Sequence, residues 1–544
     1  MKPISLIIVF LMILTGCNKD LKKADMIINN ATIYTTDSSF SIAEAMAVKD
    51  GKIMAVGTNE EINNKFSGEK KINMQGKFIY PGFIDPHSHF YGYGLSLGNA
   101  DLTGTTSFKE IIEILENHHK NHPGEWLTGR GWDQNDWADK EFPTRKLLDK
   151  KFPGVPLLLT RIDGHAALAS GEALKRANIT PDTKIEGGEI LIKNGMLSGI
   201  LIDNAIELVE KIIPKPDSAT MANALLKAQA NCFAVGLTTV SDAGLDAQVI
   251  NLMDKLQQED TLKMKIYAML NPTDENFEQY VSHGIYQTPR LDVRSIKLFA
   301  DGALGSRGAL LLKPYTDDPG NSGLLLKHPD YYREMCHIAF SANYQVNTHC
   351  IGDSAVRLML SVYGEFLKGK NDRRWRIEHA QIVDPSDLPL FGKYSVIPSV
   401  QTTHATSDMY WAGNRIGPER LKNAYIYKEL LQQNGWLPNG SDFPVESINP
   451  LYGFYAGITR KDHKGYPAGG FQPENAITRE QALRAMTIWA AKACFEEDIK
   501  GSIEPGKAAD FVVTSEDIMN MDVQNIPQLK IDQTFVDGIC VYPK

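Results

Sequence analysis

The sequence predicts an α/β protein: a TIM-type (β/α)8 barrel with one large insertion, plus a small β-sandwich made from both chain ends. Three observations support this prediction. Short apolar runs alternate with helical segments through the middle of the chain, and both ends carry short strand-like runs separated by turns. One gap in the alternation is far too long to be an ordinary loop.

The first residues read as an export signal rather than as part of the fold. Lys2 precedes an apolar run over 4–14, which has the length of a signal-peptide core and is too short to cross a bilayer. Leu-Thr-Gly-Cys follows, ending at Cys17, and resembles the lipobox of bacterial lipoproteins. We therefore expect residues 1–17 to be removed and Cys17 to carry a lipid anchor in the bacterial cell envelope. An ordinary signal peptide with an incidental cysteine is the alternative.

The chain ends predict one β-sandwich. After about residue 25, two apolar runs flank Asp50-Gly51, a pair typical of a tight hairpin turn. Strand-like runs also occur at 509–515 and 533–543. Neither end can bury a core alone, so we expect 25–78 and 496–544 to pair in one domain.

The middle of the chain, residues 79–495, predicts the barrel. Helices are expected over 218–233, 353–367 and 478–496, the last with a Thr-x-x-Gln capping box. Eight strands are expected at 78–89, 236–244, 262–270, 293–302, 344–353, 374–381, 394–404 and 435–445.

The first two of these strands are separated by an unusually long stretch. Residues 97–205 carry aromatic, glycine and proline clusters. We predict that they form an inserted subdomain over the carboxyl end of the barrel, where active sites lie in this fold.

Composition excludes some functions. The chain of 544 residues has a net charge of −9 and a pI near 5.9, which argues against nucleic-acid binding and against a polybasic membrane patch. Five widely spaced cysteines remain after Cys17, so a disulfide framework is not expected. The sequence does not fix the oligomeric state and leaves a homodimer open.

Polar residues at the ends of the predicted strands suggest a metal site. His87 and His89 are two residues apart in a strand, so both rings point to one face. The other strand-end residues are Lys297, His349, His379 and Asp442. Each of these six residues, taken alone, is better explained as an ordinary core or turn residue. Burying a polar side chain costs free energy, however, so six of them at strand ends are poorly explained by chance. Nitrogen and oxygen ligands of this kind suit a divalent metal, most simply zinc.

Several motifs together resemble the amidohydrolase superfamily, and in particular the branch that includes N-substituted formamide deformylases. The resemblance covers nearly the whole chain after residue 25. Its motifs are PGFIDPHSH at 81–89, DGHAAL at 163–168, IKLFADGALGSRGA at 296–309, NTHCIGDSAV at 347–356, RIEHAQ at 376–381, GSDFPV at 440–445 and KGSIEPGKAADFVV at 500–513.

The resemblance implies a role for each matching residue. The ligands of the more buried metal ion would be His87, His89, Lys297 and Asp442. Those of a second ion would be His349 and His379, with Lys297 carboxylated on its amine to bridge both ions. With an unmodified lysine, one ion alone would bind.

The implied reaction is hydrolysis of a non-peptide, amide-type carbon–nitrogen bond in a small substrate. A metal-bound hydroxide would attack the carbonyl, because a metal lowers the pKa of its water from 15.7 to about 7. Asp442 would act as general base and then as general acid. The same site could serve an ester, lactone or amidine hydrolase. An inactive binding lipoprotein should have lost a ligand, and none is missing.

The insertion supplies candidate substrate contacts. Trp132, Asp133 and His165 lie in it, and Trp132 with Trp137 could line a pocket. The alternative for the tryptophans, stronger for Trp137, is that they form the core of the insertion itself.

Two further candidates lie at predicted strand ends. His404 could donate a hydrogen bond to an oxyanion, or it could be a solvated loop residue. Arg307 could bind a substrate carboxylate, or it could anchor its loop to Asp301.

Overall fold

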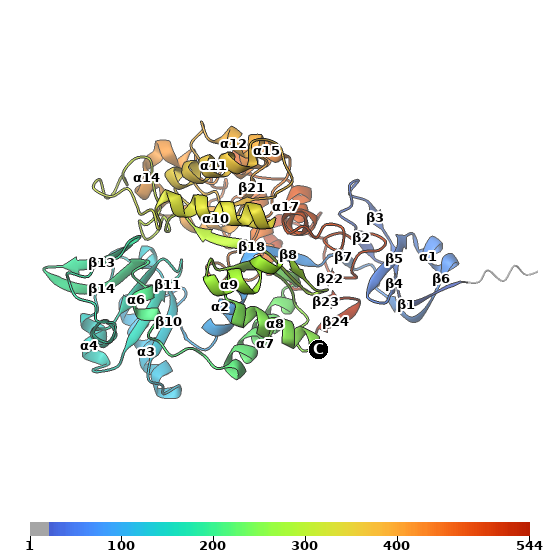
Figure 1. Ribbon diagram of the computed structural model, residues 1–544. Helices are drawn as coiled ribbons and strands as arrows, with labels where there is room; N and C mark the ends of the chain where they lie inside the picture. The colour runs from blue at the N-terminus through green and yellow to red at the C-terminus, as the bar shows by residue number, and fades with distance from the viewer. Residues whose placement is uncertain (1–20, 544) are drawn as a thin grey trace, which may run out of the picture.

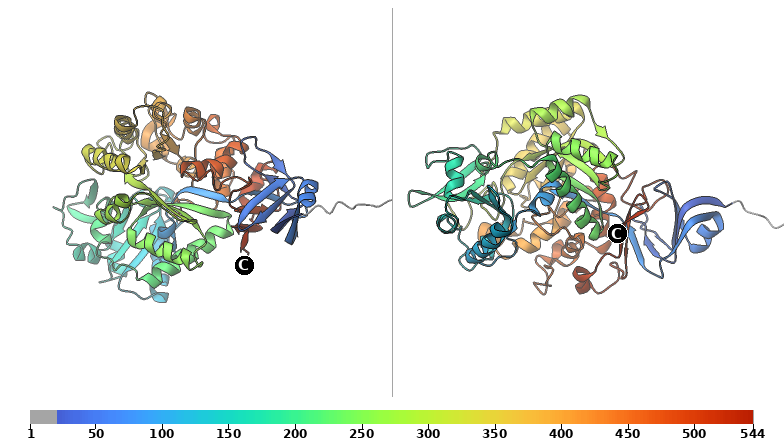
Figure 2. Two further views of the ribbon diagram at one scale, coloured as in Figure 1. Left: turned by 45° about the vertical axis from the view of Figure 1, so that its right-hand side comes forward. Right: turned by 90° about the horizontal axis from the view of Figure 1, so that it is seen from below.

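The computed structural model describes residues 21–543 and shows three parts (Figure 1). Strands from both chain ends lie on one side, the barrel is in the middle, and the insertion extends from the opposite side (Figures 1 and 2). The expected signal peptide and Cys17 lie outside the described residues. No helix within residues 21–543 is long and apolar enough to span a membrane.

A parallel sheet curls around the centre of the molecule, as a TIM-type barrel requires. Its strands lie in the order β21-β20-β19-β18-β16-β15-β8. Their bounds are β8 Phe83–Ser88, β15 Leu237–Leu245, β16 Lys265–Leu270, β18 Leu291–Phe299, β19 Gln345–Cys350, β20 Arg376–His379 and β21 Ile397–Ser399. A short strand, β17 (Tyr286–Gln287), pairs antiparallel with β18. Every residue of β8, β16, β19 and β20 is buried, as expected for a parallel sheet covered by helices.

The eighth predicted strand, 435–445, is not a strand in the structure and makes one isolated bridge, to Val400. The segment still closes the barrel, because Gly440 donates its N–H to Val400 O at 2.9 Å and Asp442 donates to His87 O at 2.8 Å. Crowding and a turn prevent regular strand geometry here. A Cβ on Gly440 would lie 2.9 Å from the His87 nitrogen, and Asp442 has a φ of +61°.

Helices cover the outside of the barrel. α11 (Asp353–Leu367) has its predicted bounds, and α7 (Ser218–Ala234) ends one residue later than predicted. The others are α2 Phe90–Ser96, α8 Ala247–Gln258, α9 Asp274–Gln279, α10 Pro329–Ala342, α12 Leu388–Tyr394, α13 Thr402–Asp408, α14 Ala412–Leu421, α15 Tyr427–Asn434 and α16 Pro450–Thr459.

The helix predicted over 478–496 is two helices in the structure. α17 (Arg479–Ala485) begins at the predicted capping box on Thr478, and α18 (Ile488–Ala493) follows it. The break falls at Thr487, whose φ of −137° and ψ of −100° are not helical.

The chain ends build two sheets that share one buried apolar cluster. One sheet has the order β5-β4-β1-β6, and the other mixes both ends in the order β24-β23-β22-β7-β2-β3. Asp50 and Gly51 form the turn between β4 and β5, with φ angles of +50° and +73°. The bounds are β1 Lys22–Asn29, β2 Thr32–Tyr34, β3 Ile42–Ala43, β4 Ala45–Lys49, β5 Lys52–Gly57, α1 Asn59–Lys65, β6 Phe66–Asn73, β7 Phe78–Pro81, β22 Phe511–Thr514, β23 Gln533–Val536 and β24 Ile539–Tyr542.

Residues 97–205 contribute six strands to a further sheet, in the order β13-β14-β12-β11-β10-β9. Separate apolar clusters cover its two faces, because alternate side chains point to opposite sides. The elements are β9 Ala100–Asp101, α3 Phe108–Asn121, β10 Leu127–Trp132, α4 Lys146–Lys151, β11 Leu157–Arg161, β12 Ala166–Ala169, α5 Gly171–Arg176, β13 Gly188–Lys193, β14 Met196–Asp203 and α6 Glu207–Glu210.

Candidate metal centre

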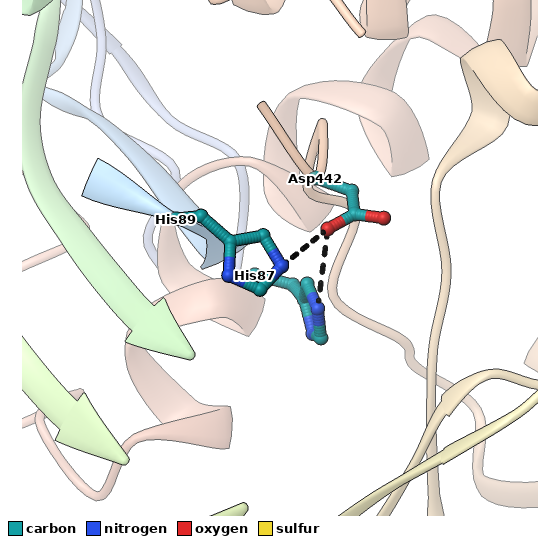
Figure 3. Close-up of side chains that lie close together, drawn as sticks. All are labelled: His87, His89 and Asp442. Carbon is teal, nitrogen blue, oxygen red and sulfur yellow. Dashed lines mark ion pairs between the residues drawn. The ribbon is translucent and has the colours of Figure 1, made fainter. Parts of the chain in front are cut away.

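The histidine pair at the end of β8 meets the carboxylate of the segment that closes the barrel (Figure 3). Oδ1 of Asp442 lies 3.2 Å from His89 Nε2 and 3.4 Å from His87 Nε2. The ligand atoms of these three residues all lie within 4.8 Å of one another. One cation could therefore contact all three side chains.

Lys297, on β18, points into the same space. Its Nζ lies 3.2 Å from His87 Nε2 and 4.7 Å from the centre of the Phe299 ring. The residue is fully buried, and burial lowers the pKa of its amine to about 8. A fraction of this lysine is therefore uncharged near neutral pH, unlike a lysine at the surface.

His349 and His379 flank these residues. The His379 ring centre lies 4.8 Å from that of His87 and 4.6 Å from that of His349. His379 Nδ1 lies 2.7 Å from the side-chain oxygen of Gln401, so its Nε2 is left for another partner. Burial lowers the pKa of His349 and of His379 well below the usual range. Both rings are neutral at pH 7, which is the form that binds a metal.

A buried ion pair that sequence reasoning missed orients His87. Glu378 Oε2 lies 2.5 Å from His87 Nδ1, and the other Glu378 oxygen accepts from Arg376. Arg376 also donates to the Pro86 oxygen at 2.6 Å. A carboxylate on Nδ1 fixes the ring, and Nε2 faces Asp442 and Lys297. The sequence signal that could have revealed this pair is Arg376 and Glu378, two opposite charges at alternate positions of the short strand β20.

The centre holds strained backbone and unsatisfied atoms. His379 and Asp442 have φ angles of +70° and +61°, a conformation that costs about 1–3 kcal/mol in a residue other than glycine. Buried Oδ1 of Asp442 and Nε2 of His404 have no hydrogen-bond partner among residues 21–543. Leaving such atoms unsatisfied costs about 1–3 kcal/mol each. A divalent cation bound to Asp442 Oδ1, which faces the imidazoles of His87 and His89, would remove part of that cost. These residues therefore fit a zinc-type metal.

Burial alone would raise the pKa of Asp442. The neighbouring His87 and His89 outweigh that effect and hold the pKa of this carboxyl well below its usual range. Asp442 is therefore ionised at neutral pH, as both a metal ligand and a general base must be.

His404 lies in α13 and not at the end of a strand, because β21 already ends at Ser399. Its ring stacks 5.7 Å from that of His379, and its Nε2 lies 3.8 Å from Asp442 Oδ2. Burial lowers the pKa of His404 to about 4. It is a buried, neutral imidazole beside the metal ligands rather than a solvated loop residue.

Three of the predicted substrate contacts serve the packing of the insertion. The indole N–H of Trp132 donates to Leu159 O at 2.7 Å, and the Trp137 ring lies 6.0 Å away in the same buried cluster. Asp133 forms an ion pair with the buried Arg161. Their contact with a substrate stays a prediction.

His165 is the predicted contact in the insertion that reaches the centre. Its ring lies 4.8 Å from that of His349. Its Nδ1 lies 2.6 Å from Oδ1 of Asp203, a buried carboxylate that the sequence did not single out. The pair forms where β14 ends beside the start of β12, and the Asp203 N–H donates to His165 O at 3.0 Å.

Arg307 forms an ion pair with Asp317 at 2.9 Å. Asp301 instead accepts the backbone N–H groups of Ile351 at 3.0 Å and Gly352 at 2.8 Å, close to His349 in the chain. Arg307 therefore anchors its loop through Asp317, and not through Asp301 as one prediction had it.

The amidohydrolase family model matches residues 70–542 of this chain. The chain belongs to the amidohydrolase family. The superfamily and the enzyme class predicted from the sequence, an amidohydrolase, are thereby confirmed.

Relatives and solved structures agree with this assignment. The amidohydrolase is 32% identical over 539 residues to Protein LONG AFTER FAR-RED 3 of Arabidopsis thaliana, covering 96% of this chain and 92% of the relative. It is 25% identical over 548 residues to the N-substituted formamide deformylase of Arthrobacter pascens, covering 96% and 98%. An uncharacterized metal-dependent hydrolase from Pyrococcus horikoshii OT3 has a TM-score of 0.76 at 28% identity, covering 92% of this chain and 99% of that structure.

Proposed function

We propose that this amidohydrolase cleaves the carbon–nitrogen bond of a small, non-peptide amide, with Asp442 as general base and then general acid. One observation carries the proposal: an ionised carboxylate at the carboxyl end of the barrel shares its Oδ1 with two imidazole nitrogens, at 3.2 and 3.4 Å. Such a carboxylate lies beside both a metal and the reacting atoms.

The metal is proposed to be zinc, as one or two ions. Its ligands are drawn from His87, His89, Lys297, His349, His379 and Asp442. When bound, zinc polarises a carbonyl oxygen and lowers the pKa of water to about 7. We propose that Lys297 is carboxylated on its buried amine if two ions bind, and that it stays unmodified if one binds.

The residues of the chain perform the proton transfers. Asp442 takes a proton from the attacking water as the carbon–oxygen bond forms. It returns that proton to the nitrogen as the carbon–nitrogen bond breaks, so the products are a carboxylic acid and an amine. His404, which lies 3.8 Å from Asp442, is a candidate donor to the carbonyl oxygen as negative charge develops on it.

The substrate class is drawn from a relative. The Arthrobacter pascens protein is named as an N-substituted formamide deformylase, and we propose a formamide or related N-acyl compound here. An ester, lactone or amidine hydrolase on the same site is the second candidate, because the same residues would serve each reaction. An inactive binding lipoprotein is the weakest candidate, since every expected ligand position is filled.

The setting of the enzyme is also proposed. The lipobox-like sequence at Cys17 supports a lipid anchor in the bacterial cell envelope, and a homodimer is compatible with the chain. The separate apolar clusters support a division into a terminal β-sandwich, a barrel and an inserted subdomain.

A soluble form beginning at Lys19, reconstituted with zinc and bicarbonate, tests the function. The assay compares N-substituted formamides, N-acyl amino acids, cyclic ureides, esters and lactones. Turnover of one amide class, lost in Asp442→Asn, would support the proposal. Turnover of esters or lactones alone would put the second candidate first. Bound metal with no turnover across the panel would reject the proposed substrates.

A further inference from the structure

An arginine in the insertion is partly buried and has no ion-pair partner among residues 21–543. Arg130 lies on β10, and its Nη2 donates to the backbone oxygen of Ile162 at 3.0 Å. Its Nε is buried without an acceptor. Within residues 21–543, Arg130 forms no ion pair. A guanidinium stays charged in proteins, so one that is partly buried and has no ion-pair partner is costly.

Four other arginines around the site form ion pairs with carboxylates. The pairs are Arg161 with Asp133 and Asp163, Arg307 and Arg415 with Asp317, and Arg376 with Glu378. Arg294 and Arg460 also lack a carboxylate, but each lies over an aromatic ring. Among residues 21–543, Arg130 has neither kind of partner, which marks its guanidinium as available to a ligand.

The insertion sheet directs Arg130 to the same side as His165. Arg130 pairs with Thr160 of β11, and Thr160 pairs with Ala167 of β12. Side chains alternate along a strand, so His165, two residues before Ala167, projects from the same face as Arg130.

Contacts link Arg130 to the metal centre. A Cβ on Gly164 would lie 3.7 Å from Arg130 Nη1, so the guanidinium packs against the residue that precedes His165. The His165 ring lies 4.8 Å from that of His349. Burial lowers the pKa of Arg130, and the charges of Asp163, Asp442 and Glu210 oppose that effect. The guanidinium therefore lies against the residue next to His165, whose ring lies beside that of His349.

We propose that Arg130 binds a carboxylate on the substrate, so that the enzyme acts on amides that carry a carboxylate, such as N-formyl and N-acyl amino acids. This inference rests on the proposed function and narrows it. The planar guanidinium offers two parallel N–H donors that match a carboxylate, and the low solvent exposure strengthens each bond. Arg307, the sequence-based candidate for this role, is already paired with Asp317.

The test compares two compounds that differ in one group. N-formylphenylalanine and N-(2-phenylethyl)formamide are assayed with the zinc-loaded enzyme. The wild type should prefer the carboxylate by about 30-fold or more in kcat/KM. Arg130→Gln should abolish that preference by raising KM for the carboxylate, with KM for the neutral compound nearly unchanged. Arg130→Lys keeps the charge without the two-donor geometry and should retain part of the preference.

A matched control uses the insertion surface. Arg176 pairs with Glu125 and Glu172 there, and Arg176→Gln should keep the wild-type preference. A wild-type preference for the neutral compound, or equal losses on both compounds in the Arg130 variants, would overturn the inference.

A binding measurement separates this inference from the proposed function. If neither formamide is hydrolysed, calorimetric titration of both compounds into the zinc-loaded protein tests Arg130 alone. Tighter binding of the carboxylate in the wild type, lost in Arg130→Gln, supports the inference although the proposed reaction fails. Equal binding of both compounds to the wild type rejects it.

Discussion

The insertion core and the barrel centre both bury polar side chains, but they satisfy them differently. In the insertion, the Trp132 N–H has a backbone acceptor and Arg161 has two carboxylates. At the barrel centre, Asp442 Oδ1 and His404 Nε2 have no hydrogen-bond partner among residues 21–543. Trp132 and Arg161 are thus satisfied within the protein, whereas Asp442 and His404 keep an atom without a partner, as Arg130 does in the insertion. Four predictions test this difference.

The largest effect is expected from Asp442→Asn. The amide cannot take a proton from water, so kcat should fall by about 10³-fold. Steady-state kinetics with the zinc-loaded protein measures the fall, and circular dichroism should show an unchanged fold. A kcat within tenfold of wild type would remove Asp442 from the proton transfers.

Trp132→Ala should act on stability and not on chemistry. Removing a fully buried indole from the insertion core should lower the free energy of unfolding by about 3–5 kcal/mol. Urea denaturation measures this, with Trp132→Phe as a control that should lose less. A large fall in kcat for folded Trp132→Ala protein would bring the tryptophan back as a substrate contact.

Glu378→Gln should weaken metal binding. The amide no longer holds His87 by a charged hydrogen bond, so zinc affinity should fall by about 10- to 100-fold. Competition with a chelator reports the affinity. Glu365→Gln is the matched control, because Glu365 pairs with Arg333 at the surface. Equal zinc affinities in the two variants would show that Glu378 does not support the metal.

The smallest effect is expected from Arg307→Ala. Its ion pair with Asp317 is partly exposed, so the loss should cost less than about 1 kcal/mol of stability. KM for carboxylate substrates should hardly change, because Asp317 already occupies the guanidinium. Thermal unfolding measures the loss of stability, and steady-state kinetics measures KM. A tenfold rise in KM would show that Arg307 also binds the carboxylate, contrary to the roles assigned to Arg307 and Arg130.

Local pattern predicted the barrel strands and the clustered polar residues at their ends. His87 and His89 follow from the period of a strand, and His349 and His379 from the convergence of parallel strands. These features depend on residues that are close in sequence, so they can be predicted without knowledge of tertiary contacts.

Features that depend on distant contacts could not be predicted in this way. The segment 435–445 fails to form a strand because Gly440 lies against the backbone of His87, far away in sequence. Glu378 and Asp203 matter through His87 and His165, partners that no spacing rule connects. Arg130 stands out through the absence of a partner, which a sequence cannot display.

The antiparallel pairing of β7 with β22 sets the order of events during biosynthesis. Tyr80 lies opposite Val512, so the ribosome must add nearly the whole chain before this ladder can form. At about 5–20 residues per second, the wait between the two strands is ~20–90 s. β8, which carries the histidine pair, follows β7 almost directly, and Asp442 also emerges late. A nascent chain therefore spends most of its synthesis without a finished metal centre.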